Sequence, residues 1–412
     1  MHYRRVREVS EPIADALEGE VDTQRETLLL IASENHVSRA VMEAQGSVLT
    51  NRNALGTPDS RLYPGSENLD ALEALAIEYA TELWGADHAN VQPHSGSLAN
   101  VAAYAALLEP GDRILSLHPA DGGHVTHGHP AHLSGELYEV DHYRVDPETG
   151  RLDYDGLEER ARAFEPDLIV SGFSAYPREI EWERIQAAAD AVGAFHLADI
   201  AHLAGPIAAG RFPSPVGIAD VATGSTYKTI RAGRGGFVLC DDAHAAAIDE
   251  AVFPGTQGGA AMPTIAGKAV GFAEALEPAF EAHVERMLAN AEALADALAA
   301  QGLHVVSGGT DTHIAVVDLR HSHEDLTGAR AEALLEAAGL ITTKTTVPGE
   351  TRPSSAASGL RLGTPALTSR GFGESAMESV GRIVARVLDE RTVTDDVTEA
   401  VARLCAAHPL YE

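Results

Sequence analysis

The strongest constraint on the fold is an alternation of short apolar runs with amphipathic segments between Asp112 and Leu239. The apolar runs have the length of buried strands and lie at Arg113–Leu117, Leu137–Val140, Leu168–Ser171, Phe195–Ala198 and Val221–Gly224. Leu157–Phe164 and Arg184–Val192 have helical periodicity and stand between these runs as crossover connections. Strands joined through helices are typical of a mainly parallel sheet with helices on both faces, so the pattern predicts an α/β fold.

The pattern changes near Thr264, where long alanine-rich helices begin and continue to Ala300. Further strand and helix patterns follow at His304–Ser307, Ile314–Asp318, Gly328–Ala338, Leu360–Leu362 and Gly373–Asp389. A chain of 412 residues also exceeds the usual size of one domain. We predict an N-terminal helical arm over residues 1–27 and a large domain over residues 28–263. A connecting helix with a smaller α+β domain would occupy residues 264–412.

Charge and apolar patterning exclude several classes of partner. The formal net charge of −31 is spread along the chain, whereas nucleic-acid binding needs basic surface. The sequence contains no run of about 18 apolar residues, so we expect no membrane span. Two cysteines and an N-terminal stretch that turns acidic early predict a cytoplasmic protein. Only three of the 30 basic side chains are lysines, against 61 acids, which favours a surface adapted to high salt.

Polar residues follow three of the expected strands, at the edge where parallel sheets bind ligands. Ser174 follows one strand, Asp199 and His202 the next, and Lys228 the third. A lysine that bonds an aldehyde needs a desolvated setting, and a buried aspartate needs a cation. Pyridoxal phosphate meets both needs, because Lys228 would hold its aldehyde as a Schiff base and Asp199 would keep its ring nitrogen protonated. An exposed loop lysine and an internal arginine partner for Asp199 are the alternatives.

Other residues suit anionic groups. Ser95-Gly96-Ser97 stands between a short strand and a helix start, where N–H groups and the helix dipole favour a phosphate, although serine is also a common N-cap. Gly258 and Gly259 would allow close backbone approach to an anion. Arg361 lies in an apolar strand and needs a carboxylate, either an internal one or that of a substrate.

The glycine-rich loop DGGHVTHGHP contains a histidine pair that admits three interpretations. His124 and His127 have the H-x-x-H spacing of metal ligands, but the sequence indicates no cysteine and no further carboxylate ligand beside them. An imidazole stacked on a cofactor ring and a solvated loop histidine are the other two. We expect His124 to stack on the cofactor, and we expect no metal site.

From about Leu28 to Ala407 the chain resembles the serine hydroxymethyltransferase family. The resemblance is carried, in order, by LLLIASEN, VMEAQGSVLTN, VQPHSGSLAN, GGHVTHG, FSAYP, LADIAH, the segment around Lys228, AVFPGTQGG, VVSGGTDTH, SGLRLGTPALTSRGF and AAHPLYE. It implies a fold-type I pyridoxal phosphate enzyme that makes or breaks the Cα–Cβ bond of a β-hydroxy amino acid. It also implies tetrahydrofolate as a second ligand, and a homodimer or tetramer with active sites shared between subunits.

The resemblance further implies a role for each matching residue. The catalytic residues would be Lys228, His124, Asp199 and Tyr63. The cofactor would be bound by Ser95, Gly96, Ser97, His124, Ser174, Asp199, His202, Ser225 and Lys228, with Gly258 and Gly259 supplied by the neighbouring subunit. The amino acid substrate would be bound by Ser33, Tyr63, His202 and Arg361.

One loop departs from the family pattern and bears on the reaction. The family reads KYAEGYPGKRYYGGCE where this chain reads RNALGTPDSRLYPGSE. Leu55 replaces an acid–base glutamate, Leu62 replaces the first of two tyrosines, and Thr345 replaces an asparagine that meets the pterin. Leucine cannot transfer a proton. Four hypotheses therefore stay open: serine–glycine interconversion with a modified folate pocket, a folate-independent threonine aldolase or transaldolase, chemistry on another amino acid, and a non-catalytic cofactor binder.

Overall fold

The computed structural model describes residues 3–411, which divide into two compact units. The large unit consists of Asn35–Glu285 and Thr346–Thr351. The small unit consists of the residues up to Glu34, Arg286–Thr345 and the residues from Arg352 on. A domain, as predicted from the sequence, is a part of the chain that folds separately. The division into two compact units does not test separate folding, so the predicted domain boundaries stay predictions.

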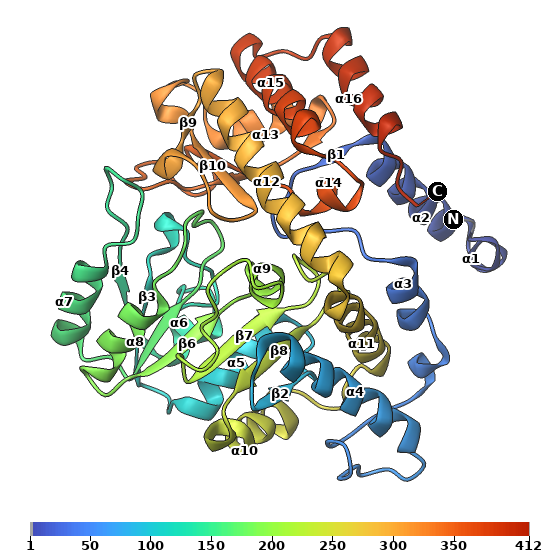
Figure 1. The fold of residues 1–412 in the computed structure, drawn as a ribbon, viewed down its shortest axis with the longest axis vertical. Helices are drawn as coiled ribbons and strands as arrows, with labels where there is room; N and C mark the ends of the chain where they lie inside the picture. The colour runs from blue at the N-terminus through green and yellow to red at the C-terminus, as the bar shows by residue number, and fades with distance from the viewer. Residues whose placement is uncertain (1–2, 412) are drawn as a thin grey trace. The chain divides into compact units, whose positions relative to one another are not determined.

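A seven-stranded sheet forms the centre of the large unit (Figure 1). Its strands, in order across the sheet, are β2 (His88–Asn90), β8 (Gly236–Cys240), β7 (Val221–Ser225), β6 (Phe195–Asp199), β5 (Leu168–Ser171), β3 (Arg113–Leu117) and β4 (Glu139–Tyr143). The strands from β7 to β4 pair in parallel, whereas β8 runs antiparallel to both β7 and β2. The prediction of a mainly parallel α/β fold is confirmed.

Helices and helical turns pack around this sheet. They are α3 (Arg39–Gln45), η1 (Val48–Asn51), α4 (Glu67–Trp84), α5 (Gly96–Leu107), η2 (Pro119–Asp121), α6 (Leu133–Leu137), α7 (Tyr154–Phe164), α8 (Trp182–Asp190), α9 (Ala204–Ala208), α10 (Asp242–Glu250), η3 (Ala251–Thr256) and α11 (Met262–Leu276). The expected strand at Leu137–Val140 begins later, at Glu139, because Leu137 is the last residue of α6. The glycine-rich stretch after Ala251 contains a helical turn, η3, that the sequence pattern did not indicate.

Helix α5 is central to the site because its N-terminus follows β2 and its body covers the sheet. Ser95 starts the helix by accepting a hydrogen bond from the Leu98 N–H at 3.1 Å through its Oγ. The small side chains of α5, among them Ala99, Ala102 and Ala103, allow the helix to lie close to the strands. They share one buried cluster with the strand residues Ile114, Leu168, Leu197, Val221 and Val238. Burial of this apolar face fixes the first turn of α5 against the sheet.

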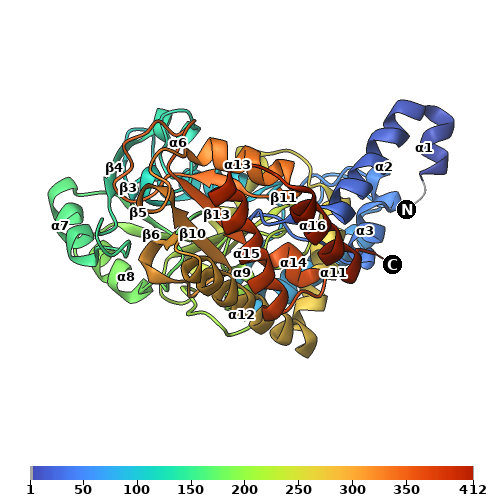
Figure 2. The same cartoon turned by 90° about the horizontal axis from the view of Figure 1, so that it is seen from above.

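The small unit contains an antiparallel sheet and a short parallel pair. The sheet has the order β12 (Thr343–Thr345), β13 (Gly359–Gly363), β10 (Ile314–Asp318) and β9 (His304–Val305), and the pair is β1 (Leu28–Leu29) with β11 (Leu340–Ile341). Figure 2 shows β10 and β13 side by side, with α13 and α15 nearby. The other elements are α1 (Arg4–Val9), α2 (Glu11–Glu26), η4 (Val306–Gly308), η5 (Leu319–His321), α13 (Gly328–Ala337), α14 (Pro365–Ser369), α15 (Glu374–Glu390) and α16 (Asp395–Ala407). Helix α12 (Pro278–Ala300) crosses the boundary between the two units.

The ends of several helices meet at Arg370 in the small unit. Arg370 is buried and donates hydrogen bonds to the backbone carbonyls of Thr27 at 2.7 Å and His408 at 2.9 Å. These bonds connect the ends of α2 and α16 to the end of α14.

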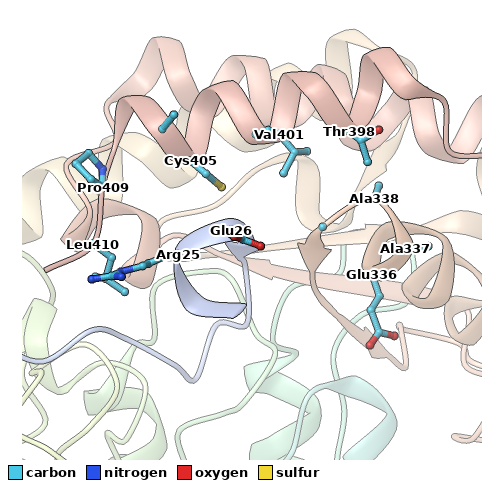
Figure 3. A pocket seen from close by; sticks show the side chains of 13 residues that line it. Arg25, Glu26, Glu336, Ala337, Ala338, Thr398, Val401, Cys405, Pro409 and Leu410 are labelled. Carbon is cyan, nitrogen blue, oxygen red and sulfur yellow. The ribbon is translucent and has the colours of Figure 1, made fainter. Parts of the chain in front are cut away.

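A hollow of about 1490 Å³, counting its open side, lies between α2, α13 and α16 (Figure 3). Cys405 and Val401 project into it from α16, and Glu26 from the end of α2. Within residues 3–411, no helix combines the length and apolar character needed to cross a bilayer.

Candidate active site

A hollow at the carboxyl ends of the parallel strands collects the predicted cofactor residues. It measures about 480 Å³ counting its mouth, and it belongs wholly to the large unit. Its lining comprises Ser95, Gly96, Ser97, Asn100, His124, Phe173, Ser174, Asp199, Ala201, His202, Ser225, Tyr227, Lys228 and Arg234. Strands β5, β6 and β7 run in parallel, so residues far apart in the sequence arrive at one edge of the sheet. The hollow between α2, α13 and α16 is larger, but the predicted chemistry gathers here.

Asp199 ends β6 and stands in a buried network of donors. Its Oδ2 accepts a hydrogen bond from Asn100 Nδ2 at 2.8 Å and lies 3.0 Å from His127 Nε2, while its Oδ1 accepts from the Ala201 N–H at 2.9 Å. Burial alone would raise the pKa of this carboxyl. The hydrogen bond and charge of His127, with smaller effects from His124 and Lys228, outweigh burial and hold the pKa below its usual range. Asp199 is therefore a buried carboxylate that stays ionised and suits a cationic partner.

His124 faces the same hollow and is held in place from its own loop. Its Nδ1 lies 2.6 Å from Thr126 Oγ1. Burial, followed by the charge of His127, lowers the pKa of His124 to about 4. The ring is thus neutral at neutral pH, which favours stacking against a flat ring over pairing with an anion.

The structure corrects one expectation about the histidine pair. No carboxylate ligand was expected near His124 and His127, but Asp199 lies there, and ligand atoms of the three residues are within 4.8 Å of one another. The sequence could not place a residue 72 positions away beside this loop. His127 Nε2 already engages Asp199 and His124 Nδ1 already engages Thr126, so the arrangement serves as a hydrogen-bond network. The absence of a metal site stays a prediction.

The first turn of α5 forms an anion cradle beside β7. Gly96 and Ser97 lie where backbone N–H groups have no acceptor within the helix, and the helix dipole adds positive potential. A Cβ atom on Gly96 would lie 3.3 Å from Ser225 Cβ, so glycine allows the helix start to approach β7 closely. Ser225 Oγ donates to the Ala201 carbonyl at 3.2 Å, and Ser174 Oγ donates to the Gly122 carbonyl at 3.0 Å. The first bond connects β7 to the turn after β6, and the second connects the turn after β5 to the loop after η2.

Lys228 is buried, with 7% of its surface exposed, in the turn that follows β7. Asn35 Nδ2 donates to the Lys228 carbonyl at 2.9 Å, and Thr229 Oγ1 donates to the His202 carbonyl at 3.1 Å. The Arg234 guanidinium lies over the Tyr227 ring at 4.2 Å. The backbone around Lys228 is therefore anchored on both sides, which fixes the origin of its side chain.

The donor set of this hollow fits pyridoxal phosphate. It combines a buried lysine amine, an ionised buried aspartate, a neutral imidazole and a helix N-terminus with two serines. These groups correspond to the aldehyde, the ring nitrogen, the ring face and the phosphate of that cofactor.

Comparison with known proteins decides the family. A family model described as serine hydroxymethyltransferase matches residues 6–384. The chain belongs to the serine hydroxymethyltransferase family. It is 60% identical over 415 residues to a serine hydroxymethyltransferase of Halobacterium salinarum, with both chains covered completely. It is 59% identical to one of Natronomonas pharaonis, covering all of this chain and 98% of the relative, and 56% identical to one of Haloquadratum walsbyi, covering both chains completely.

Family membership confirms the predicted resemblance and the fold-type I class of pyridoxal phosphate enzymes. The residue roles that the family pattern implies stay predictions. Of the predicted cofactor residues, all except Gly258 and Gly259 line the hollow. Gly258 and Gly259 lie instead on a loop whose neighbour Ala260 forms a bridge with Ala54. Their assignment to the neighbouring subunit's site also stays a prediction.

Of the predicted substrate residues, His202 lines the hollow, whereas Ser33, Tyr63 and Arg361 are not part of its lining. Tyr63 is 48% exposed on the loop before α4. Ser33 and Arg361 belong to the small unit, where the Gly363 N–H donates to the Leu30 carbonyl at 2.7 Å and brings β13 beside the segment that holds Ser33. Burial lowers the pKa of the Arg361 guanidinium, which is the environment expected for a residue that pairs with a carboxylate.

Sequence reasoning missed the roles of Asn100, His127 and Phe173 in this site. Asn100 donates to Asp199, His127 contacts Asp199, and Phe173 lines the hollow. Asn100 follows Gly96 by four positions, so the helical period places it on the same face of α5, and this spacing could have revealed it. The H-x-x-H spacing identified His127, but not its partner.

Proposed function

We propose that this protein is a pyridoxal-phosphate-dependent serine hydroxymethyltransferase, which interconverts serine and glycine and transfers the one-carbon unit to tetrahydrofolate. The observation that carries the proposal is the convergence of Lys228, Asp199 and the α5 cradle on one hollow of a chain that belongs to this family. Relatives that match along their whole length carry the same name.

When bound, pyridoxal phosphate supplies an electron sink that stabilises negative charge at the substrate Cα. The residues of the chain orient this chemistry. Asp199 holds a proton on the ring nitrogen, because its carboxylate stays ionised and therefore accepts a hydrogen bond there. His124 covers the ring as a neutral imidazole. The first turn of α5 binds the phosphate through its N–H groups.

Lys228 would bind the cofactor aldehyde through its amine, and its Nζ would hold and move a proton at the substrate. Its buried position in the turn after β7 fixes where this amine can act. Arg361 binds the substrate carboxylate with Ser33. Tyr63 acts in the partner's site, in keeping with its exposed position on the chain.

Leu55 changes how the substrate hydroxyl loses its proton. The side chain is half-buried in the loop that the family uses for an acid–base glutamate, and leucine neither donates nor accepts a proton. The proton therefore passes to a group of the hollow, with Lys228, His124 and His202 as the candidates. We expect slower turnover than a family member that carries the glutamate, by about 10²-fold or more.

The active form is a cytoplasmic homodimer or tetramer. Leu62 is 66% exposed and Val48 is 79% exposed, so the segment between α3 and α4 presents apolar side chains that a second copy would cover. Serine hydroxymethyltransferases are generally oligomeric, which supports the proposal. Analytical ultracentrifugation in molar salt measures the state directly, and a monomer would contradict it.

The reaction is tested by measuring glycine released from serine by the purified protein in molar salt, with and without tetrahydrofolate. Glycine formation that depends on tetrahydrofolate supports the proposal. Equal cleavage without tetrahydrofolate, and faster cleavage of threonine than of serine, would indicate an aldolase instead. Cofactor binding without turnover of any β-hydroxy amino acid would contradict the proposed activity.

A further inference from the structure

We propose that Lys268 is a positioning residue for the phosphate cradle, acting through the backbone on both sides of it. Lys268 lies on α11 with 1% of its surface exposed. Its Nζ donates to the carbonyls of Val91 at 2.6 Å, Gly236 at 2.8 Å and Pro93 at 3.0 Å. The three acceptors match the three N–H donors of an ammonium group. This inference rests on the proposed cofactor site.

The acceptors of Lys268 lie on the two segments that shape the cradle. Val91 and Pro93 lead from β2 into Ser95, whereas Gly236 is the first residue of β8. The Gly236 N–H also donates to the Pro93 carbonyl at 3.0 Å, and a Cβ atom on Gly236 would lie 2.2 Å from the Ser95 carbonyl oxygen. The ammonium therefore draws the segment before α5 against the start of β8, where it sets the position of the first turn of α5.

The same ammonium lies against the turn that carries Lys228. A Cβ atom on Gly235 would lie 2.2 Å from Lys268 Cε and 3.2 Å from Thr226 Oγ1. The Thr226 N–H donates to the Gly235 carbonyl at 3.0 Å, two residues before Lys228. Lys268 thus packs directly against Gly235 and bonds its neighbour Gly236, and the segment that carries Lys228 is reached only through the backbone pairing of Gly235 with Thr226.

Lysine is a specific choice at this position. The chain uses arginine for nearly all of its 30 basic residues and keeps only three lysines. A guanidinium is planar and wider than an ammonium, and the close approach of Gly235 to Cε leaves no room for it. Glu73, the carboxylate whose charge acts on Lys268, is itself buried, forms an ion pair with Arg61 and receives a hydrogen bond from Gln92 Nε2 at 2.7 Å. A charge this costly to bury indicates a function that a neutral side chain does not supply.

The test compares two probes that differ only in the phosphate. Dissociation constants for pyridoxal phosphate and for pyridoxal are measured by fluorescence titration in molar salt for the wild-type chain and for Lys268→Met. Lys344→Met is the matched control, because Lys344 pairs with Glu332 at 3.0 Å in the small unit. We expect Lys268→Met to weaken pyridoxal phosphate binding about tenfold or more, while pyridoxal binding changes less than about twofold. Lys344→Met should leave both constants unchanged.

A purely structural role for Lys268 would weaken both probes equally, and that result, or no change with either probe, would overturn the proposal. If Lys268→Met does not fold, Gly235→Ala provides the second variant. It keeps the charge but displaces Cε, and the same selective loss of phosphate-dependent affinity is expected. Failure of the wild-type protein to bind pyridoxal phosphate would instead contradict the proposed function.

Discussion

His127 Nε2 lies 3.0 Å from Asp199 Oδ2, and both side chains are buried. His127 comes from the loop after η2, whereas Asp199 ends β6. The contact offsets the effect of burial on Asp199 and keeps its carboxyl ionised. The aspartate that should hold the cofactor ring thus depends on a histidine that does not line the hollow.

Replacing His127 should weaken cofactor binding at mildly acidic pH. In His127→Leu, Asp199 loses a donor and a nearby positive charge, so its pKa rises toward the value that burial favours. We expect the affinity for pyridoxal phosphate to decrease at a higher pH in the variant than in the wild-type chain. Titrations from pH 5 to pH 8 measure this difference. His129→Leu, in the same loop, is the control, and an identical profile for both variants would contradict the role of His127.

Replacing Lys228 should remove the covalent attachment of the cofactor. In Lys228→Ala, we expect the visible absorbance of the lysine-bound cofactor to disappear, and turnover to fall by at least about 10³-fold. Absorbance spectra after dialysis against pyridoxal phosphate provide the measurement, with Lys344→Ala as a control lysine. A band that survives in Lys228→Ala would assign the attachment to another residue.

Restoring the acid–base group should increase folate-dependent turnover. Leu55→Glu places a carboxylate where the family carries one, and a positioned acid–base group is worth about 10²–10⁴ in rate. We expect at least about a tenfold gain in serine cleavage with tetrahydrofolate. Leu55→Gln is the matched control without a titratable group. No gain, even when Leu62→Tyr is added, would mean that the folate side of the site differs in more than these two positions.

Stability should fall in acid because the fold buries neutral histidines. Burial lowers the pKa of His196 to about 3, and its ring contacts Ser171 Oγ at 2.7 Å and Gln186 Oε1 at 3.0 Å. In the unfolded chain His196 binds a proton as the pH falls below about 6.5, whereas in the folded chain it stays neutral until about pH 3. The free energy of unfolding therefore decreases as pH falls from about 6.5 toward 3.

At pH 4.5 this contribution amounts to about 2–3 kcal/mol for His196. Urea denaturation at pH 4.5 and 7 should therefore show a smaller decrease for His196→Gln than for the wild-type chain. His124 and His142, each with a pKa lowered by burial to about 4, leave part of the slope in place.

The acidic surface should make stability depend on salt. The net charge of −31 means that acidic side chains repel one another across the folded chain. Salt weakens this repulsion, because the screening length shortens from about 10 Å at 0.1 M salt to about 3 Å at 1 M. We expect the melting temperature to rise by about 10 °C or more between 0.1 and 2 M potassium chloride. A melting temperature that does not change over this range would contradict adaptation to high salt.

Much of the large unit could be predicted from the sequence because its strands are short, apolar and bounded by turn residues. The bounds of β3 and β5 match the expected segments, and β6 and β7 extend one residue further. In the small unit, β10 also matches its expected segment. The errors have local causes. Leu137 belongs to α6 because a short apolar run suits a helix end as well as a strand. Strand β8 was missed because its glycine-rich approach indicates a loop.

The sequence by itself identified the side chains that carry the proposed chemistry. Lys228, Asp199 and the Ser95-Gly96-Ser97 turn stand at strand ends or a helix start, and His124 stands in a glycine-rich loop, so local patterns can be read at each of them. Only the tertiary structure decided their partners. His127 reaches Asp199 across 72 positions, and Lys268 reaches Val91 across 177. Such contacts depend on strand order and helix packing, which hydrophobic periodicity does not specify. Local pattern thus identified the reactive groups, and the packing of distant segments set the charge and position of each.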